Sequence, residues 1–173
     1  MENRSTRKLV LAALFAALIC VMTLFVKMPV PGNPSAYVHA GDGFIYTAAV
    51  IMGGPLAAAA AAVGSILADL LGGYAIYMPA TFIIKGVMGF IVGIAHTKSM
   101  NWKLAIVLMI SASMVMVLGY ALYELFLLNL TWENVLLDIY FNLGQGLFGV
   151  IIGLPLAMLV SKITPASWKE TLK

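Results

Sequence analysis

The chain consists of long apolar runs with almost no charged residues, and glycine, proline or short polar clusters separate these runs. The first run extends over 18 residues from Leu9 to Val26. A run of that length is typical of a helix that crosses a lipid bilayer. Only 10% of the residues are charged, whereas soluble domains have about 25%. The pattern predicts a membrane protein with several spans and leaves no room for a catalytic domain outside the bilayer.

The runs predict an all-α fold, a polytopic bundle of six transmembrane helices that forms one membrane domain over residues 1–173. The expected spans cover about 9–28, 42–53, 55–71, 79–95, 104–128 and 134–160. The first has no small-residue cleavage pattern at its end, so we interpret it as a retained span. The second is short, which indicates a strongly inclined helix or one that continues into the preceding segment. Pro29, Pro31 and Pro34 predict a stiff loop between these two spans.

The basic residues predict the orientation of the bundle. Six spans place both termini on the side that also holds the loop after the fourth span. Eight of the 10 lysines and arginines fall on that side. They are Arg4, Arg7, Lys8, Lys98, Lys103, Lys162, Lys169 and Lys173. The positive-inside rule therefore predicts that both termini are cytoplasmic.

Small residues recur at helical spacing and predict close helix contacts. Alanines stand four apart in the first span, Ala12 with Ala16 and Ala13 with Ala17. A run of alanines, 57–62, predicts a thin helix for the centre of the bundle. Gly86, Gly89 and Gly93 lie along one face of the fourth span. Small-xxx-small spacing of this kind lets two helix backbones approach each other.

Polar residues that interrupt the apolar spans predict a binding site in the outer half of the bundle. An ionisable group inside the membrane costs free energy, which makes it a candidate functional residue. In the predicted topology such groups from five spans reach one level. The candidates are His39, Asp42, Asp69, Lys85, Glu124, Asp138, Asn142 and Gln145. We interpret them as a site for a small polar solute.

Each of these residues also has a structural alternative. Asp42 follows a glycine and can be a helix N-cap, and Glu124 can be a solvated carboxylate at the outer rim. Lys85 can snorkel outward, but we favour a role facing the bundle, where its partner is one of the aspartates or the ligand. Asn142 and Gln145 can join helix to helix. The tyrosines at 37, 74, 77 and 140 can be interfacial belt residues.

Several functional classes lack their motifs. There is no Walker loop and no HExxH, so the chain is not expected to be an enzyme. His39 and His96 fall on opposite sides of the predicted topology, so no metal site is expected. Basic residues do not form a stripe with aromatic residues, which argues against nucleic-acid binding. Cys20 is the single cysteine, and we interpret it as a buried or lipid-facing thiol.

Three motifs between residues 38 and 93 carry a resemblance to a known family. They are H-x-G-D at 39–42, G-S-x-L-A-D-L-L-x-G-Y at 64–74, and P-x-T-x-x-I-K-G at 79–86. The chain resembles substrate-binding S components of energy-coupling factor (ECF) vitamin transporters. It is most similar to the branch that includes riboflavin, hydroxymethylpyrimidine and pyridoxine transporters.

The resemblance implies a binding subunit of an importer in the bacterial plasma membrane. It would capture a vitamin outside and dock on a transmembrane coupling protein and two cytoplasmic ATPases. Those partners use the ATP, so no cofactor is expected in this chain. The alanines at 12, 13, 16 and 17 resemble the docking surface for the coupling protein. Nickel and cobalt members begin Met-His, whereas this chain begins Met1-Glu2, which argues against a metal substrate.

The expected substrate is pyridoxine or hydroxymethylpyrimidine, and riboflavin is the alternative. A non-transport membrane scaffold is the alternative from another class. Loop 29–40 is expected to act as a lid, and the ligand ring to stack on tyrosines. The expected substrate-binding residues are Lys85, Tyr74, Tyr77, Glu124, Asp138, Asn142, Gln145, His39 and Asp42.

Overall fold

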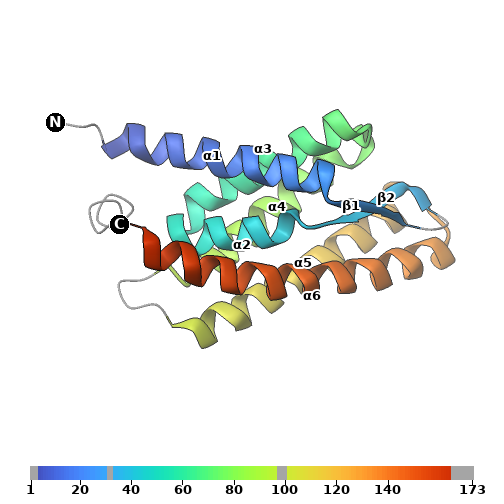
Figure 1. Cartoon of the computed structure of the whole chain (residues 1–173). Coiled ribbons are helices and arrows are strands. Elements are labelled where there is room, and N and C mark those ends of the chain that lie inside the picture. The colour runs from blue at the N-terminus through green and yellow to red at the C-terminus, as the bar shows by residue number, and fades with distance from the viewer. Residues whose placement is uncertain (1–3, 31–32, 97–100, 165–173) are drawn as a thin grey trace.

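The computed structural model describes residues 4–30, 33–96 and 101–164. These residues form six α-helices, one short 3-10 helix and a two-stranded hairpin (Figure 1). In chain order the elements are α1 (Arg4–Phe25), β1 (Lys27–Val30), β2 (Asn33–His39), α2 (Gly41–Met52), α3 (Gly54–Gly72), η1 (Ala75–Tyr77), α4 (Met78–Gly93), α5 (Trp102–Phe126) and α6 (Trp132–Ile163). The helical fold class is confirmed. That residues 1–173 form one membrane domain stays a prediction.

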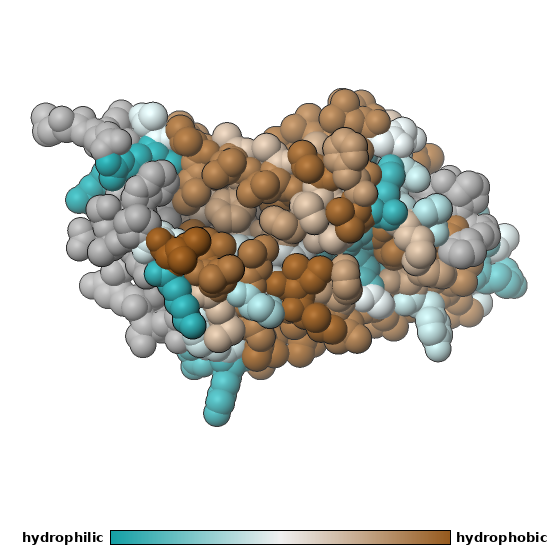
Figure 2. Space-filling model, viewed as in Figure 1, coloured by the Kyte–Doolittle hydropathy of each residue, from teal (hydrophilic) through white to brown (hydrophobic). Residues whose placement is uncertain are grey.

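Five of the helices are long and apolar enough to cross a membrane: α1, α3, η1 with α4, α5 and α6. Helix α2 has only 12 residues. The large apolar side chains that remain exposed are spread over these helices, and Figure 2 shows them as a broad brown band between more polar ends. A surface of this kind is stable against lipid tails. The prediction of a polytopic membrane protein is therefore confirmed.

Helix α2 lies at the centre of the bundle, where it packs against α1, α3, α4 and α6. All of its residues except Phe44 are buried. The alanine-rich helix α3, expected at the centre, packs against α1, α2 and α4 and is the most buried of the long helices. Helix α3 keeps an exposed face that includes Val63, Leu67 and Leu70. Only the alanines that face α1 and α4 are buried, because consecutive residues point in different directions around a helix.

Glycine and alanine bring the backbones of neighbouring helices into contact. A Cβ atom on Gly64 of α3 would lie 2.5 Å from the carbonyl oxygen of Ala16 in α1. One on Gly89 of α4 would lie 2.8 Å from the carbonyl oxygen of Ala57 in α3. A real Cβ cannot come that close to another backbone, so these positions require glycine. At Gly86 the same atom would have ordinary contacts of 3.6 Å or more.

The segment between the first two helices is a hairpin and not the predicted loop. Helix α1 ends at Phe25, so Lys27 and Met28 belong to β1 and not to a span ending at residue 28. Strands β1 and β2 pair in antiparallel fashion, with Lys27 opposite His39 and Pro29 opposite Tyr37. Proline is tolerated there because every strand of a two-stranded ribbon is an edge strand.

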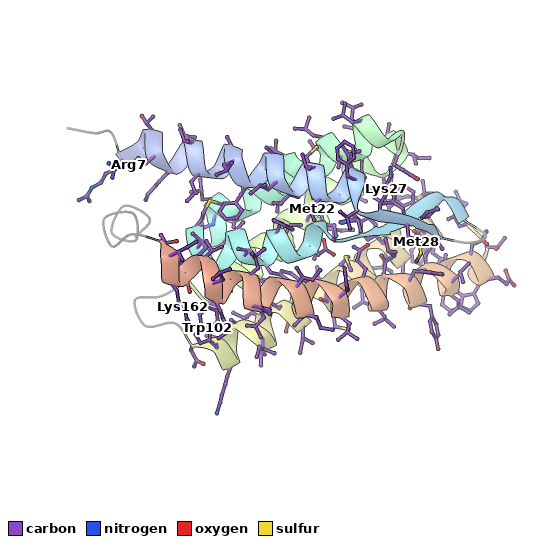
Figure 3. The ribbon with its side chains drawn as sticks, in the orientation of Figure 1. Arg7, Met22, Lys27, Met28, Trp102 and Lys162 are labelled. Atoms are coloured by element: carbon purple, nitrogen blue, oxygen red, sulfur yellow. The ribbon has the colours of Figure 1, made fainter. Side chains whose placement is uncertain are left out.

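The two ends of the bundle differ in what they hold. Helix α1 begins and α6 ends at one end, and the hairpin lies at the other, which we call the hairpin end (Figure 1). Figure 3 shows Arg7, Trp102 and Lys162 toward the first end and Lys27 and Met28 toward the hairpin end. This arrangement agrees with the charge pattern, and the cytoplasmic position of the termini stays a prediction from it. Lys98, Lys169 and Lys173 lie outside the described residues.

Candidate functional site

Five charged side chains and one amide, from five helices, are buried inside the bundle. Asp42 and Lys85 have no exposed surface, Glu124 and Asp138 are 1% exposed, Asp69 is 3% exposed and Gln145 is 5% exposed. Burying a charge is costly unless it is paired and hydrogen-bonded. The contacts of these six side chains therefore decide what the site can do.

Asp42 and Lys85 form a buried ion pair that joins α2 to α4. Lys85 Nζ lies 2.6 Å from Asp42 Oδ1, and Gln145 Nε2 donates to Asp42 Oδ2 at 2.8 Å. Lys85 Nζ also lies 3.0 Å from Met116 Sδ and 5.8 Å from the centre of the Tyr120 ring. The residue that caps α2 is Ala40, so the N-cap alternative for Asp42 was wrong. The Asp42 side chain thus fixes the central helix α2 to α4 through Lys85 and to α6 through Gln145.

Helical spacing places the other site residues on inward faces. Tyr77, Thr81 and Lys85 are spaced by four residues along η1 and α4, and so are Met116, Tyr120 and Glu124 along α5. Residues four apart lie on one side of a helix. The sequence interpretation missed Thr81 and Tyr120, although their distance of four residues from Lys85 and Glu124 was a usable signal.

A small polar cavity lies among these side chains at the hairpin end. Its volume is about 40 Å³, room for roughly three water molecules. It is lined by Tyr37, His39, Asp69, Tyr77, Thr81, Tyr120, Glu124, Asn142 and Gln145. The residues come from the hairpin and from α3, η1, α4, α5 and α6, so every element except α1, β1 and α2 contributes.

Two hydrogen bonds attach β2 to the walls of this cavity. The Tyr37 hydroxyl donates to Asp69 Oδ1 at 2.7 Å, and the His39 backbone N–H donates to Gln145 Oε1 at 2.9 Å. Burial, together with the Asp69 carboxylate, raises the pKa of Tyr37 well above its usual range, so the hydroxyl keeps its proton. The bond to Asp69 is therefore that of a neutral donor to a carboxylate.

Lys27 and Tyr74 reinforce the attachment of Tyr37. The Tyr37 and Tyr74 ring centres are 4.3 Å apart. Lys27 Nζ lies 5.0 Å from the centre of the Tyr37 ring and 4.9 Å from that of Tyr74. Cation–π contacts of this kind each contribute about 0.5–1 kcal/mol at exposed sites. Tyr74 is not a lining residue of the cavity and acts through Tyr37.

His39 is held as a neutral ring at the end of β2. Its Nδ1 accepts a hydrogen bond of 3.1 Å from the Gly41 backbone N–H, so the ring proton is on Nε2. Burial lowers the pKa of His39 to about 3, although the nearby Asp42 carboxylate opposes the shift. The ring is therefore uncharged at neutral pH and can donate one hydrogen bond.

Glu124 and Asp138 form a pair of carboxyl groups at the hairpin end. The two side chains interact, and Tyr77 donates its hydroxyl hydrogen to Glu124 Oε1 at 3.1 Å. The alternative that Glu124 is a solvated carboxylate at the rim was wrong, because the residue is buried. Glu124 lines the cavity, and Asp138 interacts with it from α6.

A larger groove of about 640 Å³ lies beside the cavity, between the hairpin and α6. Most of its lining is apolar and includes Phe25, Met28, Phe141 and Phe148. His39 and Gln145 line both spaces. The hydrogen bond between these two residues is consequently part of the partition between groove and cavity.

The predicted substrate-binding residues fall into three groups. Cavity-lining residues are His39, Tyr77, Glu124, Asn142 and Gln145. Behind this layer lie Asp42, Lys85 and Asp138. Tyr74 packs on Tyr37, and Tyr140 is 81% exposed on the groove side, where it suits an interfacial belt residue. For Tyr37 the sequence interpretation offered a belt position as an alternative, whereas the structure places it in the cavity wall.

The two alanine pairs of α1 face different surroundings. Ala16 is buried against Gly64 of α3, and Ala12 is half-buried. Ala13 and Ala17 are exposed. Ala12 and Ala16 hold α1 to the bundle, whereas Ala13 and Ala17 form a strip of small side chains on its outer face.

Among the described residues, no group of three His, Cys, Asp or Glu side chains is arranged to hold a metal ion. His96 is bonded through Nδ1 to the carbonyl oxygen of Val50 at 2.9 Å, far along the chain from His39.

Comparison with known proteins gives one family and two relatives. Residues 3–162 match the family model described as the S component of an ECF-type riboflavin transporter. The chain is 26% identical over 162 residues to the "Thiamine precursor transporter HmpT" of Lactococcus lactis subsp. cremoris (strain MG1363), covering 94% of this chain and 92% of that protein. It is 31% identical over 144 residues to an uncharacterized Pyrococcus woesei protein, covering 83% of this chain and 95% of that one.

The family match covers nearly the whole described chain and agrees with a helical membrane bundle that encloses a polar cavity. S components are non-enzymatic binding and transport subunits of the cell membrane that work with an energizing module. This chain belongs to the S components of ECF transporters.

Proposed function

We propose that this S component captures pyridoxine or hydroxymethylpyrimidine from outside the cell, and that riboflavin is the second candidate. The observation that carries the proposal is the small polar cavity at the hairpin end, whose nine lining residues all have polar or aromatic side chains. A heteroaromatic alcohol presents a flat ring for Tyr77 and Tyr120 and polar groups for the carboxylates and amides. The similarity to a thiamine precursor transporter supports a ligand of this size.

Cavity size favours the smaller candidates. A volume of about 40 Å³ is less than even a single substituted ring requires, so lining side chains must move before a ligand enters. Tyr37 and His39 are the lining residues that belong to the hairpin, and two hydrogen bonds hold them. Breaking these bonds admits one ring, whereas the three fused rings of riboflavin require a much larger rearrangement of the helices.

The hairpin is the proposed lid. At its base the Ala40 backbone N–H donates a 3.0 Å hydrogen bond to the carbonyl oxygen of Val26, the residue between α1 and β1, and this base beside α2 is the proposed hinge. The bonds of Tyr37 and His39 to Asp69 and Gln145 close it. Opening the lid removes the partition at His39 and Gln145, and this joins the cavity to the adjoining groove.

Delivery inward requires the energizing module, which we propose consists of a transmembrane coupling protein and two cytoplasmic ATPases. The strip at Ala13 and Ala17 is the proposed contact with the coupling protein. Small exposed residues four apart let a partner helix approach closely. Replacing Ala17 with Trp is expected to abolish ATP-dependent uptake while ligand binding to the isolated chain stays within about twofold. A matched Ala59→Trp variant, at an exposed alanine of α3, is expected to leave uptake unchanged.

Mass spectrometry of small molecules released from the purified protein tests the substrate directly. Isothermal titration with pyridoxine, hydroxymethylpyrimidine and riboflavin then ranks them. We expect one of the two smaller compounds to bind at least ten times more tightly than riboflavin. A protein that binds none of the three compounds with millimolar or tighter affinity would contradict the proposal. A protein that prefers riboflavin would make riboflavin the first candidate substrate.

A further inference from the structure

A second groove lies between α1 and α6, in the half of the bundle where α1 begins and α6 ends. Its volume is about 400 Å³. Both helices pack against α2, and neither packs extensively against the other, so α2 is the floor of the groove. The lining includes Leu11, Leu14, Leu18, Phe44, Leu156 and Val160. The groove shares no lining residue with the polar cavity, so it is a separate feature of the molecule.

The described lining residues of this groove offer no free polar group to an occupant. Thr47 and Thr164 are the polar members, and each donates its hydroxyl hydrogen to a backbone carbonyl four residues earlier. Thr47 Oγ1 lies 2.8 Å from the Gly43 oxygen, and Thr164 Oγ1 lies 2.6 Å from that of Val160. The other lining side chains are leucine, isoleucine, valine and phenylalanine. The groove therefore favours an apolar occupant.

The width of the groove distinguishes an acyl chain from a partner helix. Its lining extends from Leu11 to Leu18 on α1 and from Leu156 to Thr164 on α6, which is about 11 Å along the bundle. A volume of about 400 Å³ over that length gives a mean cross-section of roughly 36 Å². A helix with its side chains has a cross-section of about 80 Å² or more. The groove therefore fits hydrocarbon chains and is too narrow for a helix.

Basic residues continue the α1 wall of the groove toward the end of the bundle. Arg4, Arg7 and Lys8 precede Leu11 by seven, four and three residues. Residues at these spacings lie on one side of a helix, so the three basic residues share the side of the groove-lining leucines. Figure 3 shows Arg7 at the end of the molecule where α6 also ends. We call these three residues the basic mouth of the groove.

The carboxylates of the described residues lie far from the basic mouth. All of them are toward the hairpin end, namely Asp42, Asp69, Glu124, Glu133 and Asp138. With the predicted orientation, the basic mouth lies at the cytoplasmic surface of the membrane, where anionic lipids attract basic segments. The mouth therefore suits a phosphate headgroup, and the groove beside it suits the attached acyl chain.

We propose that the groove between α1 and α6 binds an anionic phospholipid of the cytoplasmic leaflet. Its headgroup contacts the basic mouth, and one acyl chain lies between the two helices on the floor that α2 provides. The lipid buries apolar surface of two helices that lack extensive contact, which stabilises their arrangement. Ala13 and Ala17 lie on a different side of α1, so this site is distinct from the proposed contact with the coupling protein. The inference does not depend on the identity of the transported solute.

Native mass spectrometry of the purified full chain tests the headgroup contact, with dioleoylphosphatidylglycerol and dioleoylphosphatidylcholine as probes. The wild-type protein is expected to bind its first phosphatidylglycerol at least tenfold more tightly than its first phosphatidylcholine. The double variant Arg7→Gln with Lys8→Gln is expected to weaken phosphatidylglycerol binding about 10- to 30-fold. Lys103→Gln with Lys162→Gln removes the same charge at the same end, from α5 and α6, and should leave the affinity within twofold.

A second pair of variants tests the acyl-chain contact. Leu14 is 54% exposed, so Leu14→Trp is expected to fold and to fill part of the groove. It should weaken binding of the first phosphatidylglycerol at least tenfold. Val107→Trp, on an exposed face of α5, is the matched control and should leave binding within twofold.

Three results would overturn the proposal. The first is equal affinity of the wild-type protein for the two lipids, a comparison that decides the question even where a variant does not fold. The second is an equal loss of affinity in each variant and its control, which would assign lipid binding to the surface as a whole. The third is a Leu14→Cys variant that cross-links to a second copy in phosphatidylglycerol vesicles, which would give the groove to a protein partner.

Discussion

The two ends of this bundle are built from the same helices by different chemistry. Toward the hairpin end the buried side chains include Asp69, Glu124 and Asp138, and a cavity lies between them. Toward the opposite end the buried side chains of α3, α4 and α5 are small or aliphatic, as at Ala57, Met88 and Val92. Backbones there approach each other closely, as at Gly89.

This difference shows how a small membrane protein combines a rigid frame with a space for a ligand. Close packing of glycine and alanine holds helices through many weak dispersion contacts and leaves no room for water. The hairpin end instead uses a few strong polar contacts between long side chains. Such contacts can be exchanged one for one with those of a ligand, whereas backbone packing cannot.

The largest expected effect comes from breaking the ion pair at the hairpin end. Lys85→Met leaves Asp42 buried without its cation, which is expected to lower the free energy of unfolding by about 3–5 kcal/mol. Denaturation in mixed micelles measures the change. The double variant Asp42→Asn with Lys85→Met removes both charges and should recover most of the loss. If the single and double variants are equally destabilised, the loss of stability does not come from the unpaired charge of Asp42.

A smaller effect is expected from the frame. Gly89→Ala places a methyl group 2.8 Å from the Ala57 carbonyl oxygen and is expected to cost about 1–3 kcal/mol. Gly86→Ala, in the same helix with contacts of 3.6 Å or more, should be neutral or stabilising by up to about 1 kcal/mol. The same denaturation assay compares them. If both variants behave alike, contact between α3 and α4 does not depend on the missing side chain.

The third expected effect is a pH dependence that belongs to His39. Its pKa is about 3 in the folded protein and about 6.5 in an unfolded chain, so the unfolded state binds more protons between these values. Stability from this residue is present above about pH 6.5 and decreases as the pH falls toward 3, by at most about 1.4 kcal/mol per unit. Asp42, Lys85 and Lys27 act on the same ring. His39→Gln should flatten the profile between pH 4 and 6.5, and an unchanged slope would assign it to other groups.

The sequence predicted the helices well because their apolar runs are long and clearly ended by glycine or proline. It did not predict the hairpin, since the prolines at 29 and 34 are typical of a loop and cross-strand pairing leaves little local signal. Sequence patterns also brought Asp42 and Lys85 to one level of the bundle. They could not select Asp42 over Asp69 or Asp138 as the partner of Lys85, because that choice depends on how α2, α4 and α6 pack.

The Tyr37 contact shows the same limit. A tyrosine near the outer surface suits a membrane belt, and only the pairing of β2 with β1 turns its hydroxyl toward Asp69. Thr81 and Tyr120 could have been identified from their helical spacing to Lys85 and Glu124. Their role depends on a hydrogen bond between α4 and α5 that the spacing alone does not specify.

The shortness of α2 has an electrical consequence. Its 12 residues extend about 18 Å, well short of a hydrocarbon layer of about 30 Å. The hairpin comes directly before its first residue, so opening of the proposed lid is expected to let water reach the level of Asp42, and the membrane potential then falls mainly across the remaining thickness. With the predicted orientation, a singly charged cation in the cavity has crossed little of that field. Its later passage inward then gains up to about 2.3 kcal/mol for every 100 mV of potential, negative inside.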